Sequence, residues 1–327
     1  MSAVALRMVE QLRTRRLLLW LALVVAGASA ITVGVVGVYR YVDNYWNYRG
    51  FAPPTDPRFV STKGTFASLT VTSAALGGRS QPVDVYLPPG YAAHPRRRYP
   101  VVYLLHGFPG VPSSYFKAGR LGVVEDILLA KRVIRPVILV APFGSTGVFT
   151  DKEWANGVRP HEGWETYFAR DVVHAVDARF RTIRAGWARA LVGLSEGGYG
   201  ALNIAAHHPG EFHMLESWSG YVKADNISSI FGRRKAALVA NSPAVTFPKV
   251  AAKLRRAGTY VWFYSGSVDK LLGQNRKFEQ ELRGLRIPSH FYVVRGGHDW
   301  ALWRGQASRA LVAAADSLVR PGGRHAR

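Results

Sequence analysis

The hydrophobic positions of this chain follow two different patterns. Residues 17–39 form a run of 23 residues without a charged side chain. As a helix this run would span roughly 34 Å, enough to cross the hydrocarbon core of a bilayer, which is about 30 Å thick. From residue 65 onward the apolar positions come instead in short runs separated by polar segments, glycines and prolines. The pattern therefore predicts one transmembrane helix followed by a globular domain.

The short apolar runs of the second part alternate with segments of helical periodicity. The strand candidates are 65–74, 82–87, 101–105, 137–141, 190–193, 214–217, 260–265 and 290–295. The helix candidates are 123–130, 164–179, 199–208, 247–257, 277–285 and 300–319. Such alternation is typical of a mostly parallel sheet covered by helices, and unbroken apolar runs such as 101–105 and 137–141 predict strands buried on both faces. We therefore expect an α/β fold.

The charges around the long apolar run predict its orientation. Residues 1–16 are basic and should remain in the cytoplasm, as positively charged flanks of a membrane segment do. A cleaved signal peptide is the alternative, since Ala28-Ser29-Ala30 resembles a cleavage site, but the apolar run continues beyond it and favours an uncleaved signal anchor. Both interpretations place the globular domain on the extracytoplasmic side, in a single-pass protein of the cell membrane. The predicted segments are a cytoplasmic N-terminus at 1–16, the anchor at 17–39, a tether at 40–63, a catalytic domain at 64–319 and a disordered tail at 320–327.

The net charge of +22 favours anionic partners. The basic residues are scattered, apart from small clusters at 96–98 and 233–235, and no nucleic-acid-binding signature accompanies them, so no nucleic-acid partner is expected. Next to a membrane segment, an anionic lipid surface is the better interpretation. The chain has no cysteine, which excludes disulfides, thiolate nucleophiles and thiolate metal ligands.

The segment Gly193-Leu194-Ser195-Glu196-Gly197 carries the most specific chemistry. It follows the apolar run at 190–193 and precedes the helical segment at 199–208. G-x-S-x-G between a strand and a helix is the pattern of a nucleophile elbow, a strained turn that exposes a serine hydroxyl at the end of a sheet. Gly193 and Gly197 would provide the close backbone approach that this turn needs. We therefore predict that Ser195 is a nucleophile.

A serine nucleophile needs a base, and the base needs an acid to orient it. His298 follows the last predicted strand, on a loop that opens at the same sheet edge as the elbow. Asp269 follows the strand at 260–265 and lies at that edge as well, with Asp299 and then Asp225 as weaker candidates for the acid. The order Ser195, Asp269, His298 is the chain order of α/β-hydrolases.

The oxyanion of an acyl-transfer reaction needs backbone donors. The N–H group of Glu196, directly after the nucleophile, would be one. The loop after the strand at 101–105 should supply the other, and Phe108 is the candidate because Pro109 has no N–H group. Gly107 would let this loop approach the substrate, and His106 would orient the loop rather than act as a base.

Three motifs together resemble a known family. They are Leu-Leu-His-Gly at 104–107, Gly-Leu-Ser-Glu-Gly-Gly-Tyr-Gly-Ala at 193–201 and Gly-Gly-His-Asp-Trp at 296–300. In order and spacing they look like the esterase D or putative esterase family of α/β-hydrolases, which includes S-formylglutathione hydrolases, feruloyl esterases, enterochelin esterases and antigen 85-type mycolyltransferases. The resemblance covers residues of about 65–318. It implies an α/β-hydrolase fold and a serine esterase or acyltransferase without a cofactor or a metal.

By this resemblance Ser195, Asp269 and His298 take the roles of a catalytic triad, and Phe108 and Glu196 provide the oxyanion hole. The chain departs from the family at Glu196, where many members carry Met, and at Phe108-Pro109, where smaller residues are common. The Glu196 side chain should point away from the oxyanion, where it could repel anionic substrates or hold a cationic one.

The substrate pocket is expected to be built by variable loops. The aromatic candidates for its walls are Phe149, Trp154, Trp164, Phe231 and Trp300, and residues 221–256 are expected to form a cap-like insertion. A membrane segment, apolar walls and a basic surface favour an ester of a lipid or an envelope component. The main hypothesis is an esterase that transfers the acyl group to water. The alternatives are an acyltransferase that passes it to an envelope sugar or lipid, and a non-catalytic envelope-binding protein on a hydrolase scaffold.

Overall fold

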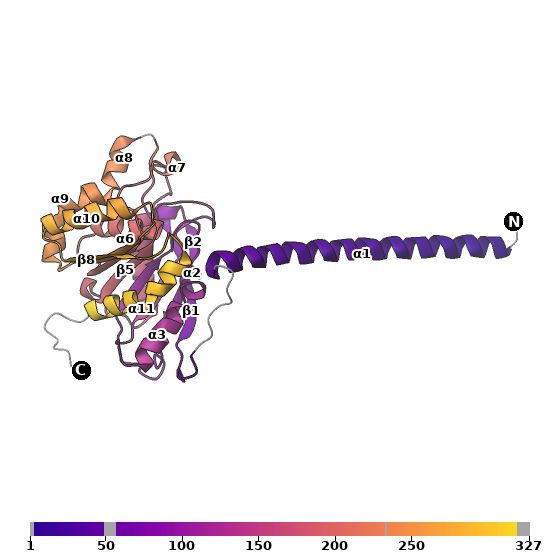
Figure 1. Cartoon of the computed structure of the whole chain (residues 1–327), viewed down its shortest axis with the longest axis horizontal. Coiled ribbons are helices and arrows are strands. Elements are labelled where there is room, and N and C mark those ends of the chain that lie inside the picture. The colour runs from indigo at the N-terminus through magenta and orange to yellow at the C-terminus, as the bar shows by residue number, and fades with distance from the viewer. Residues whose placement is uncertain (1–2, 49–56, 233, 319–327) are drawn as a thin grey trace. The chain divides into compact units, whose positions relative to one another are not determined.

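The computed structural model describes residues 3–48, 57–232 and 234–318 of the chain (Figure 1). The chain divides into two units, Met1–Pro54 and Thr55–Arg327. The first contains the helix α1 (Ala3–Tyr48), which is longer than the predicted anchor at 17–39. Within α1, Leu12–Val38 is long and apolar enough to cross a membrane by length and composition.

The tether predicted at 40–63 does not begin where expected. Residues 40–48 continue α1, because no glycine or proline follows Gly37 until Gly50. The remainder of the tether lies partly outside the described residues, and the tail predicted at 320–327 lies outside them entirely.

The second unit is built on a mixed sheet of eight strands, in the order β1-β2-β4-β3-β5-β6-β7-β8. The strands are β1 (Thr65–Ser73), β2 (Arg79–Leu87), β3 (Val101–Leu105), β4 (Ile138–Pro142), β5 (Arg189–Leu194), β6 (Met214–Trp218), β7 (Tyr260–Gly266) and β8 (Ser289–Val294). Strands β1 and β2 are antiparallel to each other and β2 is antiparallel to β4, whereas the pairs from β4 to β8 are parallel. The predicted α/β class and mostly parallel sheet are confirmed.

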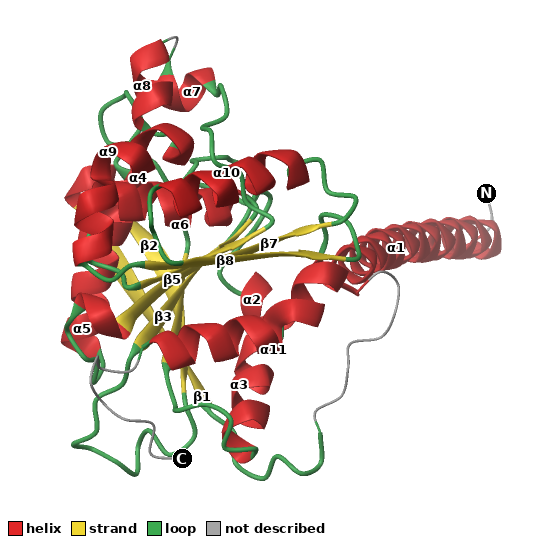
Figure 2. Ribbon diagram, turned by 60° about the vertical axis from the view of Figure 1, so that its left-hand side comes forward, coloured by secondary structure: helices red, strands yellow, loops and turns green. Residues whose placement is uncertain are grey.

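Helices cover both faces of the sheet (Figure 2). One face carries α4 (Trp164–Thr166), a π-helical turn (Tyr167–Val172), α5 (Val173–Arg179), α6 (Glu196–His207), α9 (Pro243–Arg256) and α10 (Leu272–Gly284). The other carries α2 (Ser114–Lys117), α3 (Leu121–Ala130) and α11 (Trp300–Ser317). Two short 3₁₀ turns lie at Ala74–Leu76 and Gly186–Ala188. The helix predicted as one piece at 164–179 contains a π-helical turn. The helix α10 begins five residues before the predicted residue 277. The additional first turn includes Asn275, which is buried and donates a hydrogen bond to Gly220 O.

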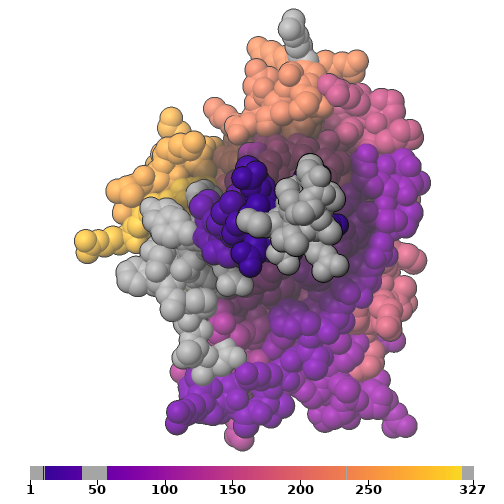
Figure 3. All heavy atoms as spheres, turned by 90° about the vertical axis from the view of Figure 1, so that its right-hand side faces the viewer, coloured from indigo at the N-terminus to yellow at the C-terminus, as the bar shows by residue number. Residues whose placement is uncertain are grey.

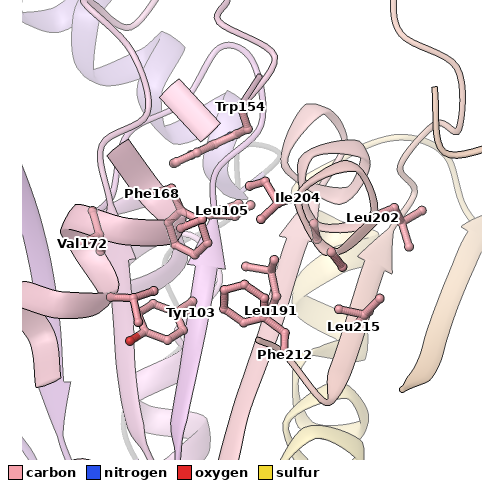
Figure 4. Packing of buried hydrophobic residues seen from close by; sticks show 14 of the residues in the cluster. Tyr103, Leu105, Trp154, Phe168, Val172, Leu191, Leu202, Ile204, Phe212 and Leu215 are labelled. Atoms are coloured by element: carbon pink, nitrogen blue, oxygen red, sulfur yellow. The ribbon is translucent and has the colours of Figure 1, made fainter. Parts of the chain in front are cut away.

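The central strands are buried on both faces, as their unbroken apolar runs predict. Successive residues of β3 alternate between the two cores: Tyr103 and Leu105 belong to one, and Val102 and Leu104 to the other. Figure 4 shows Tyr103, Leu105 and Leu191 facing Phe168 and the residues of α6. Each fully buried side chain of this size contributes about 1.5–3 kcal/mol to stability relative to its exposed state. The sheet is therefore a rigid base for the loops at its ends.

The insertion at 221–256 is only partly a cap. Its helices α7 (Ser228–Phe231) and α8 (Lys235–Ala240) project from the body of the unit (Figures 1 and 3). The third, α9, packs against α6 and contributes Phe247 and Leu254 to the core. The cap is therefore smaller than expected, because the apolar face of α9 is buried in the helical layer.

Candidate active site

The candidate site lies where the order of the sheet reverses. From β3 the chain continues to β4 on one side, and β5 then adds on the other side of β3. In open α/β sheets the crevice outside the carboxyl ends of two such strands is the usual place for a ligand. Ser195 directly follows β5, and the loop that begins at His106 directly follows β3. The topology thus brings the predicted nucleophile and oxyanion loop to one crevice.

Ser195 lies in a strained turn between β5 and α6. Its backbone has φ 53° and ψ −119°, outside the regions that residues with a side chain normally adopt. A Cβ atom on Gly193 would lie 1.9 Å from Gly197 O, and one on Gly197 would lie 1.9 Å from Leu105 O. Both glycines are therefore required sterically for this turn, as the elbow motif predicts.

His298 connects the serine to a carboxylate. Its Nε2 atom lies 2.8 Å from Ser195 Oγ, and its Nδ1 atom lies 2.9 Å from Asp269 Oδ2. The second oxygen, Asp269 Oδ1, accepts a hydrogen bond of 2.9 Å from Leu271 N. A carboxylate facing Nδ1 holds the proton on that nitrogen, so the lone pair of Nε2 faces the serine hydroxyl. This arrangement is the one in which an imidazole can accept the serine proton.

Asp269 is held in its charged form although its side chain is fully buried. Burial acts to raise the pKa of this carboxyl, but the hydrogen bonds from His298 and Leu271 N outweigh it and hold the pKa below its usual value. The alternative acids lie elsewhere. Asp299 caps α11 by accepting from Leu302 N, and Asp225 is exposed on the pocket wall.

The predicted oxyanion loop passes close to the nucleophile. A Cβ atom on Gly107 would lie 2.9 Å from Leu194 O and 3.1 Å from Ser195 Cβ, so this close approach requires glycine. Phe108 lines the same pocket as Ser195 and His298, and Glu196 is the first residue of α6. Their N–H groups are the candidate donors on the two sides of the serine.

His106 is buried and orients the loop. Its Nε2 atom accepts a hydrogen bond of 3.1 Å from Gly144 N, so its Nδ1 atom is the donor to Gly107 O at 3.0 Å. Burial lowers the pKa of His106 to about 4, because a charged imidazolium would lose its hydration there. The neutral ring satisfies both bonds, and neither of them involves Ser195.

A pocket of about 720 Å³ opens at Ser195 and His298. Its walls come from the loop at 221–225, the beginning of α9 and the first half of α10, with Lys223, Lys270 and Lys277 among the lining side chains. Asp151, Asp225 and Glu281 line the pocket as well, so its walls combine apolar contacts with charges of both signs.

The predicted aromatic walls are wrong. Trp154, Trp164 and Phe231 are at most 1% exposed, Trp300 packs against Tyr115 and Trp303, and Phe149 is exposed away from the pocket lining. Burial of a large aromatic side chain removes much apolar surface from water, and Trp154, Trp164, Phe231 and Trp300 are buried in the protein instead of lining the pocket. Lys270 and Leu271 could have been found from the sequence, since they directly follow Asp269.

A cluster of acidic residues lies beside the elbow, and the sequence contains no sign of it. Glu153 N donates to both Glu196 Oε1 and Asp151 Oδ1, each at 2.9 Å. The Glu196 side chain thus points into the protein, and its carboxyl also bonds to that of Asp151. Burial, together with the charges of Asp151 and Glu153, raises the pKa of Glu196 well above its usual value. Among the described residues, no group of three or more histidine, aspartate or glutamate side chains could hold a metal ion.

Glu153 makes the stability of this unit depend on pH. Burial, followed by the charge of Asp151, raises its pKa from 4.5 to about 9. Between these values the native state binds more protons than the unfolded state, so the free energy of unfolding falls as pH rises, by up to about 1.4 kcal/mol per pH unit for one group. Glutamine cannot ionise. We expect Glu153→Gln to retain more stability than the wild type as pH rises from 5.5 to 8, measured by urea unfolding of the full chain in detergent, and parallel curves for the two proteins would contradict this.

The chain matches proteins of known family. Residues 73–314 match the family model described as putative esterase. A curated relative, Esterase Rv1288 of Mycobacterium tuberculosis, is 29% identical over 244 residues, which cover 66% of this chain and 52% of the relative. The chain thus spans about half of the length of the first curated relatives that it matches.

Solved structures share the fold. A ferulic acid esterase superposes with a TM-score of 0.69 at 25% identity, covering 79% of this chain and all of the other. An S-formylglutathione hydrolase from Agrobacterium tumefaciens has a TM-score of 0.66 at 18% identity, covering 79% and 97% of the two chains. The predicted resemblance and the α/β-hydrolase fold are confirmed.

Proposed function

This chain belongs to the putative esterase family, and from this premise we propose that it hydrolyses carboxylic esters through an acyl-enzyme on Ser195. The observation that carries the proposal is the chain of hydrogen bonds from the buried Asp269 through His298 to Ser195 Oγ, with Ser195 and His298 lining a pocket of about 720 Å³. A serine, an imidazole and a buried carboxylate in this geometry form the arrangement that activates a serine for acyl transfer.

The proposed reaction has two halves. Ser195 Oγ attacks the carbonyl carbon of the ester while His298 Nε2 takes the hydroxyl proton, and Asp269 stabilises the imidazolium that forms. The N–H groups of Phe108 and Glu196 receive the oxyanion. His298 then gives the proton to the departing alcohol, and the acyl group remains on Ser195. A water molecule repeats these steps on the acyl-enzyme, releasing the acid and restoring the serine.

The proposed substrate is an ester of a lipid or an envelope component, met on the extracytoplasmic side of a membrane. The candidate span at Leu12–Val38, the basic residues before it and the net charge of +22 support this location. The pocket walls carry Lys223, Lys270 and Lys277 together with carboxylates, so the preference for an anionic ester that we propose rests on the net charge of the whole chain, +22. In this proposal α1 anchors the chain and the unit at 55–327 acts on the ester.

The test is hydrolysis by the full chain in detergent micelles. We expect release of p-nitrophenol from p-nitrophenyl butyrate, with the free acid as the second product. We also expect hydrolysis of a lipid ester in mixed micelles to be faster when its headgroup is anionic than when it is neutral, with a difference that shrinks at high salt. A folded chain that releases no product from any of these esters would overturn the proposal. An acyl group recovered on an added alcohol instead of water would replace hydrolysis with acyl transfer.

A further inference from the structure

The two candidate oxyanion donors belong to segments that are far apart in the sequence. Phe108 lies in the loop after β3, whereas Glu196 opens α6 after β5. An oxyanion hole works only when its donors lie within about 0.5 Å of the productive geometry. Some structure must therefore set the distance between the two segments.

One loop, at 144–154, bonds to both through its two buried ends, 144–145 and 153–154, while residues 146 and 148–150 between them are exposed. On one side Trp154 Nε1 donates to His106 O at 3.0 Å, and Gly144 N donates to His106 Nε2 at 3.1 Å. On the other side Glu153 N donates to Glu196 Oε1 at 2.9 Å. Two adjacent residues, Glu153 and Trp154, thus join the oxyanion loop to the nucleophile elbow.

The conformation of these two residues is unusual. Glu153 and Trp154 have φ values of 56° and 47°, both in the left-handed region. A bulky residue there is uncommon and strained, and such strain persists only where the surroundings determine it. Strain of this kind is found preferentially at functional sites.

The surroundings do determine the position of Trp154. Its side chain is fully buried and lies above Phe168 and Leu105 in Figure 4. A Cβ atom on Gly144 would lie 2.4 Å from the indole ring, and one on Gly200 of α6 would lie 2.7 Å from Trp154 Cβ. Glycines on both sides therefore form a seat into which the indole fits without freedom to shift.

We propose that Glu153 and Trp154 form a clamp that sets the position of the Phe108 N–H group relative to the Glu196 N–H group, with Trp154 as a positioning residue that acts through the carbonyl of His106. The inference rests on the proposed esterase function. Because the oxyanion exists only in the tetrahedral intermediate and the transition states around it, a disturbed clamp weakens binding of those states and leaves binding of the ester ground state intact.

Trp154→Phe tests the clamp. Phenylalanine retains an aromatic ring in the seat but has no N–H group for His106 O. Loss of one oxyanion donor costs about 10²–10³ in kcat, and a donor displaced but not lost should cost less. We expect kcat to fall about 10–100-fold with KM within about twofold. The inhibition constant of phenylboronic acid, which forms a tetrahedral adduct with a serine, should rise by a similar factor.

Trp164→Phe is the matched control. Trp164 is a buried tryptophan of the same core, 1% exposed, whose indole N–H donates to Glu162 Oε2 at 2.7 Å. This hydrogen bond does not involve the oxyanion loop, so we expect the substitution to lower the melting temperature and to leave kcat within about threefold of the wild type. If Trp154→Phe does not fold, Gly200→Ala displaces Trp154 from the α6 side and should produce the same selective loss of kcat.

The outcomes separate the two proposals. The clamp is supported if Trp154→Phe or Gly200→Ala lowers kcat selectively and weakens inhibition by phenylboronic acid, and if Trp164→Phe does neither. The clamp alone is overturned if the wild type is active and kcat is unchanged in Trp154→Phe and Gly200→Ala. It is also overturned if the loss of kcat follows the loss of melting temperature in all three variants. A folded wild type that neither hydrolyses the ester nor binds phenylboronic acid overturns the esterase function, and the clamp with it.

Discussion

Replacing Ser195 with alanine is expected to lower kcat for ester hydrolysis about 10⁵–10⁶-fold, because the acyl-enzyme can no longer form. His298→Ala should cost a similar factor, since its Nε2 atom, 2.8 Å from Ser195 Oγ, is the acceptor for the serine proton. Residues that act as a unit are not additive, so the double variant should be about as slow as either single one. KM should change little.

The measurement is release of p-nitrophenol under single-turnover conditions, with the full chain in detergent. Ser80→Ala is the control, because Ser80 is an exposed residue of β2 whose hydroxyl bonds to Thr72 Oγ1, on the β1–β2 edge of the sheet. Its kcat should stay within about twofold of the wild type. If Ser195→Ala retained more than about 1% of wild-type kcat, Ser195 would not be the nucleophile.

The second large effect is expected for Asp269→Asn, which should lower kcat about 10³–10⁴-fold. The asparagine amide would present a donor to His298 Nδ1, and the imidazole would then turn its proton toward Ser195 and lose its role as base. Because hydrogen bonds hold the Asp269 pKa below its usual value, the carboxylate stays charged throughout the neutral range. Its contribution to stability is present above pH 4 or so and is lost as pH falls through the folded-state pKa.

Asp299→Asn provides the comparison, because Asp299 adjoins His298 in sequence but caps α11. Asparagine is also a good N-cap, so both stability and kcat should be nearly unchanged. The same pair of variants distinguishes Asp269 from Asp299, the second of the three candidate acids. A loss of kcat in Asp299→Asn as large as that in Asp269→Asn would mean that His298 is oriented differently from the geometry described.

The elements of the sheet were predictable because their signals are local. The apolar run of β3 was located at 101–105 without error, and the elbow motif identified its own strand, turn and helix. Ser195, Asp269 and His298 follow the ends of β5, β7 and β8, which lie at one edge of a parallel sheet. Their meeting follows because parallel strands end at the same edge, and the alternation of strands and helices predicts the parallel direction.

The pocket was not predictable in the same way. Trp154 and Trp164 were assigned to its walls because aromatic residues in long loops suit a binding site, yet both are buried in the core. An aromatic residue in a loop is equally suited to line a pocket or to fill a core, and only the packing of the surrounding elements decides which. The same holds for α9, whose apolar face covers α6 instead of forming a cap.

The class of fold, the candidate membrane helix and the three residues of the predicted triad follow from the amino-acid sequence, because each depends on periodicity or on a motif at a strand end. The residues that line the pocket, and the way in which Glu153 and Trp154 join the oxyanion loop to the elbow, follow from the packing of the folded chain. Glu153 and Glu196 are 43 residues apart, and Trp154 and His106 are 48 apart. No local pattern encodes such pairs, because they form only when the core packs around them.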